Sequence, residues 1–368
     1  MSRTPFNRII RFIITFVLSL LGGTLFYFLH VPLPWLLGSM VIVLITSTFT
    51  KYPLYWPIQI RNTGLIVIGY MLGSSITLVT LIAIIHQLPT MLIVTLFIVI
   101  SSMCFAFFVS KFTGISLRSA IAGSIPGGLS QMIVLGEEIK DVDVTVVTFF
   151  QLTRLFSVIF IVPVIALSPL LENGVGSNIT ILGESEEVWQ WSLLVIYTIA
   201  TIAAAFIGKI AKLPTAYLLG PMLITAIVGL SGIPSPELPN IIVDVSQLMM
   251  GAYIALMIKP AKLENKVKTA VAAIITGLAL VCFSFGIGIA LEFIHEIPAV
   301  TAFLSTAPGG IAEMGIVAKE VNADLPTVTG YQTFRILFIL FLVPYTLRWL
   351  FRQQWFINME NMKKRSSK

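Results

Sequence analysis

A chain in which 57% of the 368 residues are hydrophobic and only 11% are charged has too few polar side chains to cover a water-facing surface. This composition excludes a soluble enzyme, a disordered chain and a disulfide-bonded scaffold, and the two cysteines are too few for a metal cluster. The net charge of +6 comes from short basic clusters between apolar segments, a pattern typical of cytoplasmic loops that face anionic lipid headgroups. We therefore predict an all-α polytopic membrane protein.

Twelve apolar elements follow one another along the chain. The first six are expected at residues 9–29, 33–49, 62–85, 88–110, 117–137 and 142–167. The last six are expected at residues 188–208, 213–230, 241–258, 269–291, 299–318 and 325–351. We predict a first membrane repeat at 9–167, an acidic external linker at 168–187, a second membrane repeat at 188–351 and a basic cytoplasmic tail at 352–368.

The two repeats share three motifs in register. Leu-Leu-Gly-x-Met begins at Leu36 and again at Leu218, and Pro-Gly-Gly-x-x-x-Met begins at Pro126 and again at Pro308. A Gln-x-x-Arg motif pairs Gln151 and Arg154 with Gln332 and Arg335. Chance matches between apolar segments would not repeat a Pro-Gly-Gly or an intramembrane Gln-x-x-Arg in register. The chain is a tandem duplication.

The basic residues decide between two topologies. With six crossings in each repeat, the Lys-rich loop at 259–268 would lie outside and the linker, which lacks Lys and Arg, would lie inside. That arrangement contradicts the positive-inside rule. Five crossings per repeat invert the second repeat and place both termini and the basic loops in the cytoplasm. We predict inverted repeats, in which one element of each repeat is broken or re-entrant.

The fifth element of each repeat is the predicted non-crossing element, because Pro-Gly-Gly interrupts its centre and proline breaks a helix. The short, Pro-flanked second element is the alternative. An inverted duplication with a broken element in each half is typical of secondary transporters, whose site lies near the membrane midplane. The expected backbone contacts to the solute come from Pro126, Gly127, Gly128, Pro308, Gly309 and Gly310. In the alternative interpretation, these glycines only permit close helix crossing.

Arg154 and Arg335 lie inside apolar helices, where an ionised side chain costs roughly 3 kcal/mol and needs a partner or a cavity. Gln151 and Gln332 lie one helical turn away on the same face. In one interpretation these amide and guanidinium groups bind an anionic substrate such as a carboxylate. In the other, they form an internal ion pair or cap the carbonyl groups of the broken element.

Glu313 has no acidic counterpart in the first repeat, where Gln131 occupies the same place. Such asymmetry is expected where one of two related sites has been specialised to bind a coupling ion, H⁺ or Na⁺. The alternative is that Glu313 pairs with Arg154 or Arg335.

No catalytic constellation, metal site or cofactor is predicted, because the three histidines lie far apart at element ends and the sequence has no phosphate-binding loop. The expected partners are a small solute with H⁺ or Na⁺ and membrane lipid, with further copies of the chain left open. Nucleic acid is not expected as a partner.

The three duplicated motifs resemble those of the membrane AbrB family, whose members carry two copies of an AbrB duplication domain. The resemblance extends from about Phe12 to Leu350. Family members are labelled as ammonia monooxygenases or AbrB-type regulators. A copper monooxygenase would need a histidine cluster, and a DNA-binding regulator would need a soluble basic domain; the sequence offers neither.

These observations favour a secondary transporter of a small solute, with an anion among the candidates, whose site lies between the two Pro-Gly-Gly elements. It is expected to be a multi-pass protein of the plasma or bacterial inner membrane. The alternative function is a membrane-embedded sensor or regulatory protein that acts indirectly on gene expression.

Overall fold

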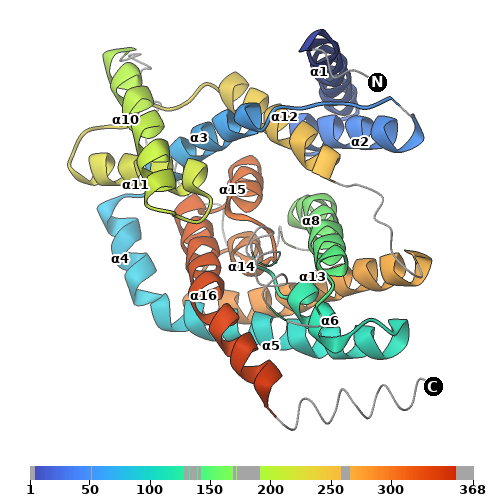
Figure 1. Ribbon diagram of the computed structural model, residues 1–368. Helices are drawn as coiled ribbons and strands as arrows, with labels where there is room; N and C mark the ends of the chain where they lie inside the picture. The colour runs from blue at the N-terminus through green and yellow to red at the C-terminus, as the bar shows by residue number, and fades with distance from the viewer. Residues whose placement is uncertain are drawn as a thin grey trace. The chain divides into compact units, whose positions relative to one another are not determined.

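Fourteen helices and no strand make up the part of the chain that the computed structural model describes (Figure 1). The described residues are 5–50, 52–127, 132, 139, 142–168, 171, 191–257 and 266–353. Most of the predicted linker and tail, the centre of the Lys-rich loop, and Gly128 and Gln131 lie outside them. Within the described part, the all-α architecture expected from the composition is confirmed.

The helices of the first half are α1 (Pro5–Phe28), α2 (Pro34–Phe49), α3 (Ile58–Ser74), α4 (Leu78–His86), α5 (Leu88–Thr113), α6 (Leu117–Ser124) and α8 (Val144–Ala166). Those of the second half are α10 (Trp191–Ile210), α11 (Ala216–Leu230), α12 (Asn240–Met257), α13 (Lys266–His295), α14 (Ala299–Thr306), α15 (Ile311–Glu320) and α16 (Leu325–Arg352).

Seven of the described helices are long and apolar enough to cross a membrane: α1, α5, α8, α10, α12, α13 and α16. The helices α2 and α11 are apolar but have only 16 and 15 residues. At 1.5 Å per residue they are about 24 and 23 Å long, which is less than the roughly 30 Å of a bilayer core. The ten crossings expected from the sequence therefore require these two helices and the α3–α4 pair in addition to the seven long ones.

The third element of the first repeat, predicted at residues 62–85, consists of two helices. The helices α3 and α4 are bent by 88° relative to each other. Ser75 Oγ donates a hydrogen bond to the Leu72 carbonyl (2.8 Å), and the backbone N–H of Thr77 donates to Thr80 Oγ1 (2.8 Å). Serine and threonine side chains that bond to nearby backbone compete with helical hydrogen bonds. Apolar periodicity alone does not detect this competition, so the bend is visible only in the structure.

The chain forms two compact units, each assembled from parts of both repeats. The first unit comprises Met1–Ile85, Pro163–Lys259 and Gly315–Thr329, and the second comprises His86–Val162, Pro260–Met314 and Gly330–Lys368. The first three elements of each repeat thus lie in the first unit. The helix breaks and the Gln-x-x-Arg motifs lie in the second unit, so the folded units do not follow the sequence repeats.

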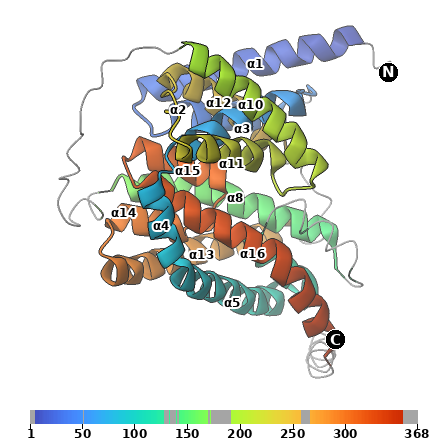
Figure 2. The same cartoon turned by 90° about the vertical axis from the view of Figure 1, so that its left-hand side faces the viewer.

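Within the first unit, α3 packs on α11 and α12 packs on α2, so each repeat contributes one helix to each pair (Figure 2). A side chain at Gly69 would overlap the Leu218 carbonyl oxygen, and one at Gly251 would overlap that of Leu36. Gly69 and Gly251 occupy corresponding positions in the repeats, as do Leu36 and Leu218. Corresponding positions therefore make the same close contact, which is a packing counterpart of the duplication.

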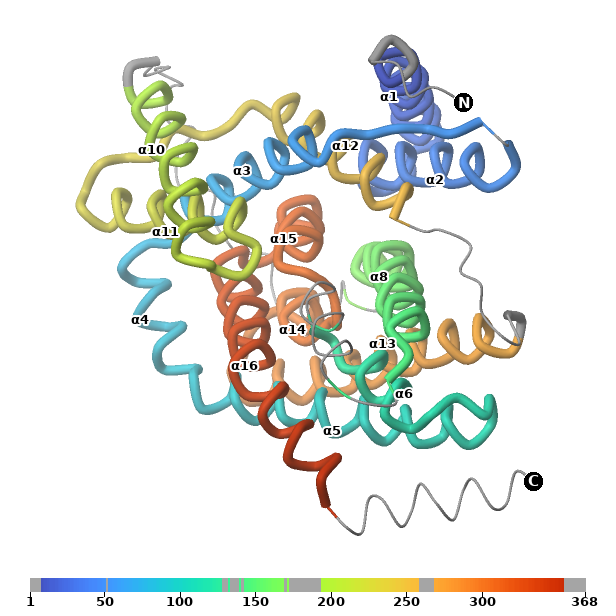
Figure 3. Tube along the Cα trace, viewed as in Figure 1, coloured from blue at the N-terminus to red at the C-terminus, as the bar shows by residue number. Residues whose placement is uncertain are grey.

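Within the second unit, α5 packs on α13, α6 packs on α5, and α14 packs on α13 (Figure 3). Ala120 and Ile121 of α6 belong to one buried apolar cluster with Val147 of α8 and Ile339 of α16. This cluster fixes the short helix α6 against the helices that carry Arg154 and Arg335, and so it positions the first helix break.

Candidate functional site

The break in the second repeat lies between α14 and α15. The helix α14 ends at Thr306, and Ala307 takes an extended conformation (φ −53°, ψ 134°), as expected of a residue before proline. The next helix begins at Ile311. Because Pro308 has no N–H and the chain leaves the helix here, the carbonyl groups of the last turn of α14 lack their usual helical donors.

Gln332 of α16 supplies two of the missing donors. Its Nε2 donates to the carbonyl oxygens of Leu304 (2.8 Å) and Ala307 (3.1 Å). Its Oε1 accepts a hydrogen bond from Arg335 Nη2, so both ends of the amide are used. The side chain is fully buried, and its hydrogen bonds offset the cost of burying an amide among apolar helices.

Arg335 supplies further donors to the same break. Nη1 donates to the carbonyl oxygens of Ala307 (2.7 Å) and Thr306 (3.2 Å), and Nη2 donates to that of Gly309 (2.7 Å). The residue is only 2% exposed. A planar guanidinium group can reach several carbonyl oxygens at once, which a lysine ammonium group cannot do with the same geometry. Arg335 was interpreted either as an anion-binding group or as a cap for the carbonyl groups of the broken element, and the structure contains the capping bonds.

In the described part of the first repeat, a glutamine and an arginine at corresponding positions bond to the end of α6. The helix α6 ends before Ile125, which is also extended (φ −63°, ψ 129°). Gln151 Nε2 donates to the carbonyl oxygens of Ala122 (3.2 Å) and Ile125 (2.8 Å), and Arg154 Nη1 donates to that of Ile125 (3.0 Å). Ala122 and Ile125 correspond to Leu304 and Ala307 of the second repeat. Pro126 and Gly127 follow directly, whereas Gly128 lies outside the described residues.

The two arginines differ in how fully they are bonded. Arg154 is partly exposed, whereas Arg335 is buried. Among the described residues, Gln151 Oε1 has no hydrogen-bond partner, although its counterpart in Gln332 accepts from an arginine. The Nε atoms of both arginines are also buried without a partner in that part of the chain. The first repeat therefore leaves more of its hydrogen-bonding capacity unused than the second.

Arg154 and Arg335 both belong to the second unit, and both lie in apolar helices. Two like charges in one apolar region repel each other, and an anion placed near both would relieve that repulsion. The arrangement can thus hold freed carbonyl oxygens and, at the same time, create a region of positive potential beside the breaks.

The methionine of the duplicated motif covers the first glycine of each break. A side chain at Gly127 would meet Met132, and a side chain at Gly309 would meet Met314. Both methionines are fully buried. A flexible thioether can fill an irregular space beside a non-helical backbone. The sequence contained this signal, because the methionine repeats in register, but the pattern alone did not assign it a role.

Glu313 is the third residue of α15, and a negative charge there interacts favourably with the positive end of the helix dipole. A side chain at Gly310 would overlap the Glu313 carboxylate, so this carboxylate lies against the second glycine of the break. Arg335 binds the carbonyl group of Gly309. Glu313 and Arg335 therefore approach the Gly309–Gly310 segment, one at each residue.

The sequence predicts the amide and guanidinium groups on one helix face, and one of the two interpretations gives the carbonyl groups of the broken element as their acceptors. Those acceptors are backbone carbonyls of a different element, and only the geometry of the break selects them. Within the described ranges, no group of three His, Cys, Asp or Glu side chains is placed to hold a metal ion.

Long apolar helices, and a buried polar cluster formed at corresponding places in two repeats, define a multi-pass helical membrane protein of duplicated architecture. The family model described as "Transition state regulatory protein AbrB" matches residues 35–351. The chain belongs to this AbrB family, as its duplicated motifs led us to expect.

Two bacterial relatives match over nearly their whole length. "Putative regulator AbrB" of Escherichia coli (strain K12) is 25% identical over 338 residues, which cover 91% of this chain and 94% of that protein. "Uncharacterized protein YhjN" of Bacillus subtilis (strain 168) is 21% identical over 345 residues, covering 89% and 90%.

Proposed function

We propose that this protein is a secondary transporter of a small anionic solute in the cell membrane. The observation that carries the proposal is the pair of helix breaks, each held by a glutamine and an arginine from a long apolar helix. Non-helical backbone and ionised side chains are costly in a membrane interior, and they occur there mainly along solute and ion pathways. Paired broken elements in two repeats are the arrangement expected of a transporter.

The repeats are inverted in this proposal, and both termini are cytoplasmic. The Pro-Gly-Gly elements enter the membrane from opposite sides, and the solute binds where their ends meet near the midplane. Its partners are H⁺ or Na⁺, membrane lipid and, as an open question of assembly, further copies of the chain. The proposal includes neither catalysis nor a cofactor.

The two arginines have different roles in the proposed site. Arg335 holds the second break, because its guanidinium group already donates to three carbonyl groups and to Gln332. Arg154 is more exposed, and among the described residues it donates to one carbonyl group, that of Ile125. We assign the direct contact with the anion to Arg154, and we assign the binding of the coupling ion to Glu313.

The proposal is tested with purified protein in two steps. A thermal-shift screen of small anions, amines and metabolites, with and without Na⁺ and at several pH values, identifies a ligand through its stabilisation of the folded protein. Flux of that ligand into liposomes then measures transport. If no anion stabilises the protein and none crosses the membrane, the proposal is wrong.

A double variant, Gly309→Ala with Gly310→Ala, tests whether the break is the site. The added methyl groups would meet the side chains of Met314 and Glu313, whose flexible ends can move aside, so the variant should still fold and insert. It should lose flux, because the added methyl groups displace the Met314 and Glu313 side chains that lie against the two glycines. Gly286→Ala is the matched control, since nothing lies within 4 Å of a side chain at that position. Normal flux in the double variant would assign these glycines to packing alone.

The second candidate function is a membrane-embedded sensor or regulatory protein. It is favoured by the description of the matching family and by the name of the E. coli relative, both of which refer to regulation. A sensor would bind a ligand without flux, and its deletion would change transcription. The Gly309–Gly310 variant would restore normal transcription only if it still binds the ligand. Ligand binding without flux in liposomes therefore favours this alternative.

A further inference from the structure

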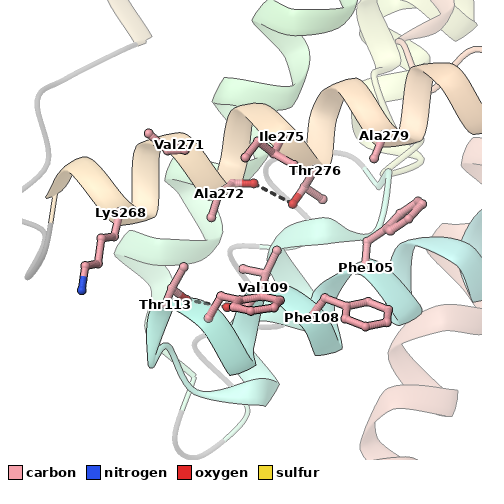
Figure 4. Close-up of a pocket in the computed structure, with 11 residues that line it drawn as sticks. Phe105, Phe108, Val109, Thr113, Lys268, Val271, Ala272, Ile275, Thr276 and Ala279 are labelled. Carbon is pink, nitrogen blue, oxygen red and sulfur yellow. Dashed lines mark hydrogen bonds between the residues drawn. The ribbon is translucent and has the colours of Figure 1, made fainter.

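An apolar groove lies between α5 and α13 in the second unit, away from the helix breaks, and has a volume of about 600 Å³ (Figure 4). That volume is in the usual range for binding sites of small molecules, roughly 300–1,000 Å³. The side chains that define its character are Phe105, Phe108, Phe112, Thr113, Lys268 and Thr276. Both helices are long and apolar enough to cross a membrane, so the groove runs along membrane-spanning segments.

The wall of the groove is apolar in effect, even at its two threonines. Thr113 Oγ1 donates to the Val109 carbonyl and Thr276 Oγ1 donates to the Ala272 carbonyl, each at 2.7 Å, as the dashed lines in Figure 4 show. Both hydroxyl protons are thus used within their own helices. A ligand here would meet phenyl rings and methyl groups, so most of its length must be hydrocarbon.

One end of the groove is basic. Among its described lining residues, Lys268 is the charged one; it is exposed and lies in the first turn of α13. The opposite wall at this end is Thr113, the last residue of α5, and Lys111 lies in the same last turn. Figure 4 shows the Lys268 ammonium group at this end, with the phenylalanines Phe105 and Phe108 further along the groove.

We propose that the groove binds an anionic phospholipid, with one acyl chain along the apolar wall and the phosphate group beside Lys268. The apolar length and the single basic end match the two parts of such a lipid, and the surrounding bilayer supplies it. A lysine near an anionic headgroup contributes about 1 kcal/mol of attraction, whereas a zwitterionic lipid gains little of it. The basic end is the one that the positive-inside rule places in the cytoplasm, so the lipid belongs to the cytoplasmic leaflet. The site is independent of the proposed transport function.

The test uses purified full-length protein in a neutral detergent, with phosphatidylglycerol and phosphatidylcholine of identical acyl chains added separately. Native mass spectrometry counts the lipids that each variant retains. We expect wild-type protein to retain one more phosphatidylglycerol than phosphatidylcholine. Lys268→Gln should bind phosphatidylglycerol about fivefold more weakly and leave phosphatidylcholine unchanged. Lys209→Gln, which removes a basic residue from the last turn of α10, is the charge control and should behave as wild type.

A second pair of variants tests the apolar wall. Ala279→Phe fills the groove and should remove one bound lipid, whereas Leu278→Phe, at a neighbouring exposed position outside the lining, should not. Lys268 is exposed, so its substitution spares the fold and the charge test stands even where Ala279→Phe fails to fold. Equal binding of both lipids by wild type and Lys268→Gln overturns the proposal. A wild-type dimer that Ala279→Phe dissociates also overturns it, because a second copy would then occupy the groove.

Discussion

Arg154 and Arg335 occupy corresponding positions in the two repeats but differ in their hydrogen bonds and in their burial. Each donates to the carbonyl group of the residue before a Pro-Gly-Gly, which also accepts from the backbone N–H of the first glycine, so each arginine adds a donor where the helix ends. Arg335 caps the helix end with several hydrogen bonds and is almost fully buried, whereas Arg154 is partly exposed. A buried carbonyl group left without a donor costs about 1–3 kcal/mol, so the more committed arginine should matter more for stability.

We expect Arg335→Lys to lower the free energy of unfolding by about 3 kcal/mol, because a lysine ammonium group cannot reach all three carbonyl groups. Arg154→Lys should cost about 1 kcal/mol but weaken anion binding tenfold or more, since it loses the planar fork. Denaturant unfolding in detergent and ligand thermal shifts measure the two effects. The opposite ranking, with Arg154 more important for folding and Arg335 for binding, would contradict the assigned roles.

Glu313 provides the second prediction at this scale. Glu313→Gln imitates the amide that the first repeat carries as Gln131, so the change should be sterically mild. If Glu313 binds the coupling ion, the variant should fold and bind the solute but lose the pH or Na⁺ dependence of transport. If Glu313 instead neutralises an arginine, stability should fall and partly recover when that arginine is also replaced by glutamine. Unchanged stability, binding and ion dependence would show that the ion site lies elsewhere.

At the scale of elements, backbone contacts determine how the helices pack. Lipid provides no hydrophobic driving force for helices to associate, so membrane helices depend on close packing. Small residues permit that packing because they let helix backbones approach each other. Gly69 of α3 and Gly251 of α12 face carbonyl oxygens of α11 and α2, respectively. Glycine lowers the intrinsic stability of a helix by about 1 kcal/mol relative to alanine, so its use here reflects the crossing.

We expect Gly69→Ala and Gly251→Ala to destabilise the protein by similar amounts, about 2 kcal/mol each, because the added methyl group overlaps a backbone oxygen that cannot move without separating the helices. The control Gly286→Ala should be neutral or stabilise by up to about 1 kcal/mol, since that position in α13 is open. Thermal unfolding in detergent ranks the three. A loss of stability in the control as large as in the test variants would refute the close-contact explanation.

At the scale of the whole molecule, the repeats and the compact units divide the chain differently. Each unit collects corresponding elements from both repeats, so neither repeat forms a unit by itself. An inverted duplication would account for this exchange, because elements one to three of one copy could then pair with the same elements of the other. The number of crossings in each repeat decides whether the copies are inverted.

Cysteine accessibility tests that topology. In a background without cysteine (Cys104→Ser and Cys282→Ser), five crossings per repeat predict that Ser235→Cys reacts with an impermeant thiol reagent from outside the cell and that Lys212→Cys does not. Six crossings predict the reverse. Lys111→Cys is cytoplasmic in both arrangements and serves as the control. Labelling of Lys212 from outside, with Ser235 protected, would remove the inverted-repeat model.

Much of the helical architecture was determined by the sequence alone. Backbone groups in a bilayer have no water to bond, so long apolar runs must form helices, and the bounds of α2, α5 and α16 lie close to their predicted ranges. The shared motifs also identified the duplication and placed Gln151 and Arg154 one turn apart, because helical periodicity fixes such spacing.

Only the tertiary structure decided which groups these residues bind. The backbone acceptors of Gln332 and Arg335 lie more than twenty residues away in the chain, in the last turn of α14 and in the break that follows it. The bend between α3 and α4, the composition of the two units and the unequal bonding of the two arginines likewise depend on contacts between distant segments. Local sequence pattern predicts where a helix can form. Hydrogen bonds and close packing between distant segments determine where the helix breaks and which side chains bond to the carbonyl groups at the break.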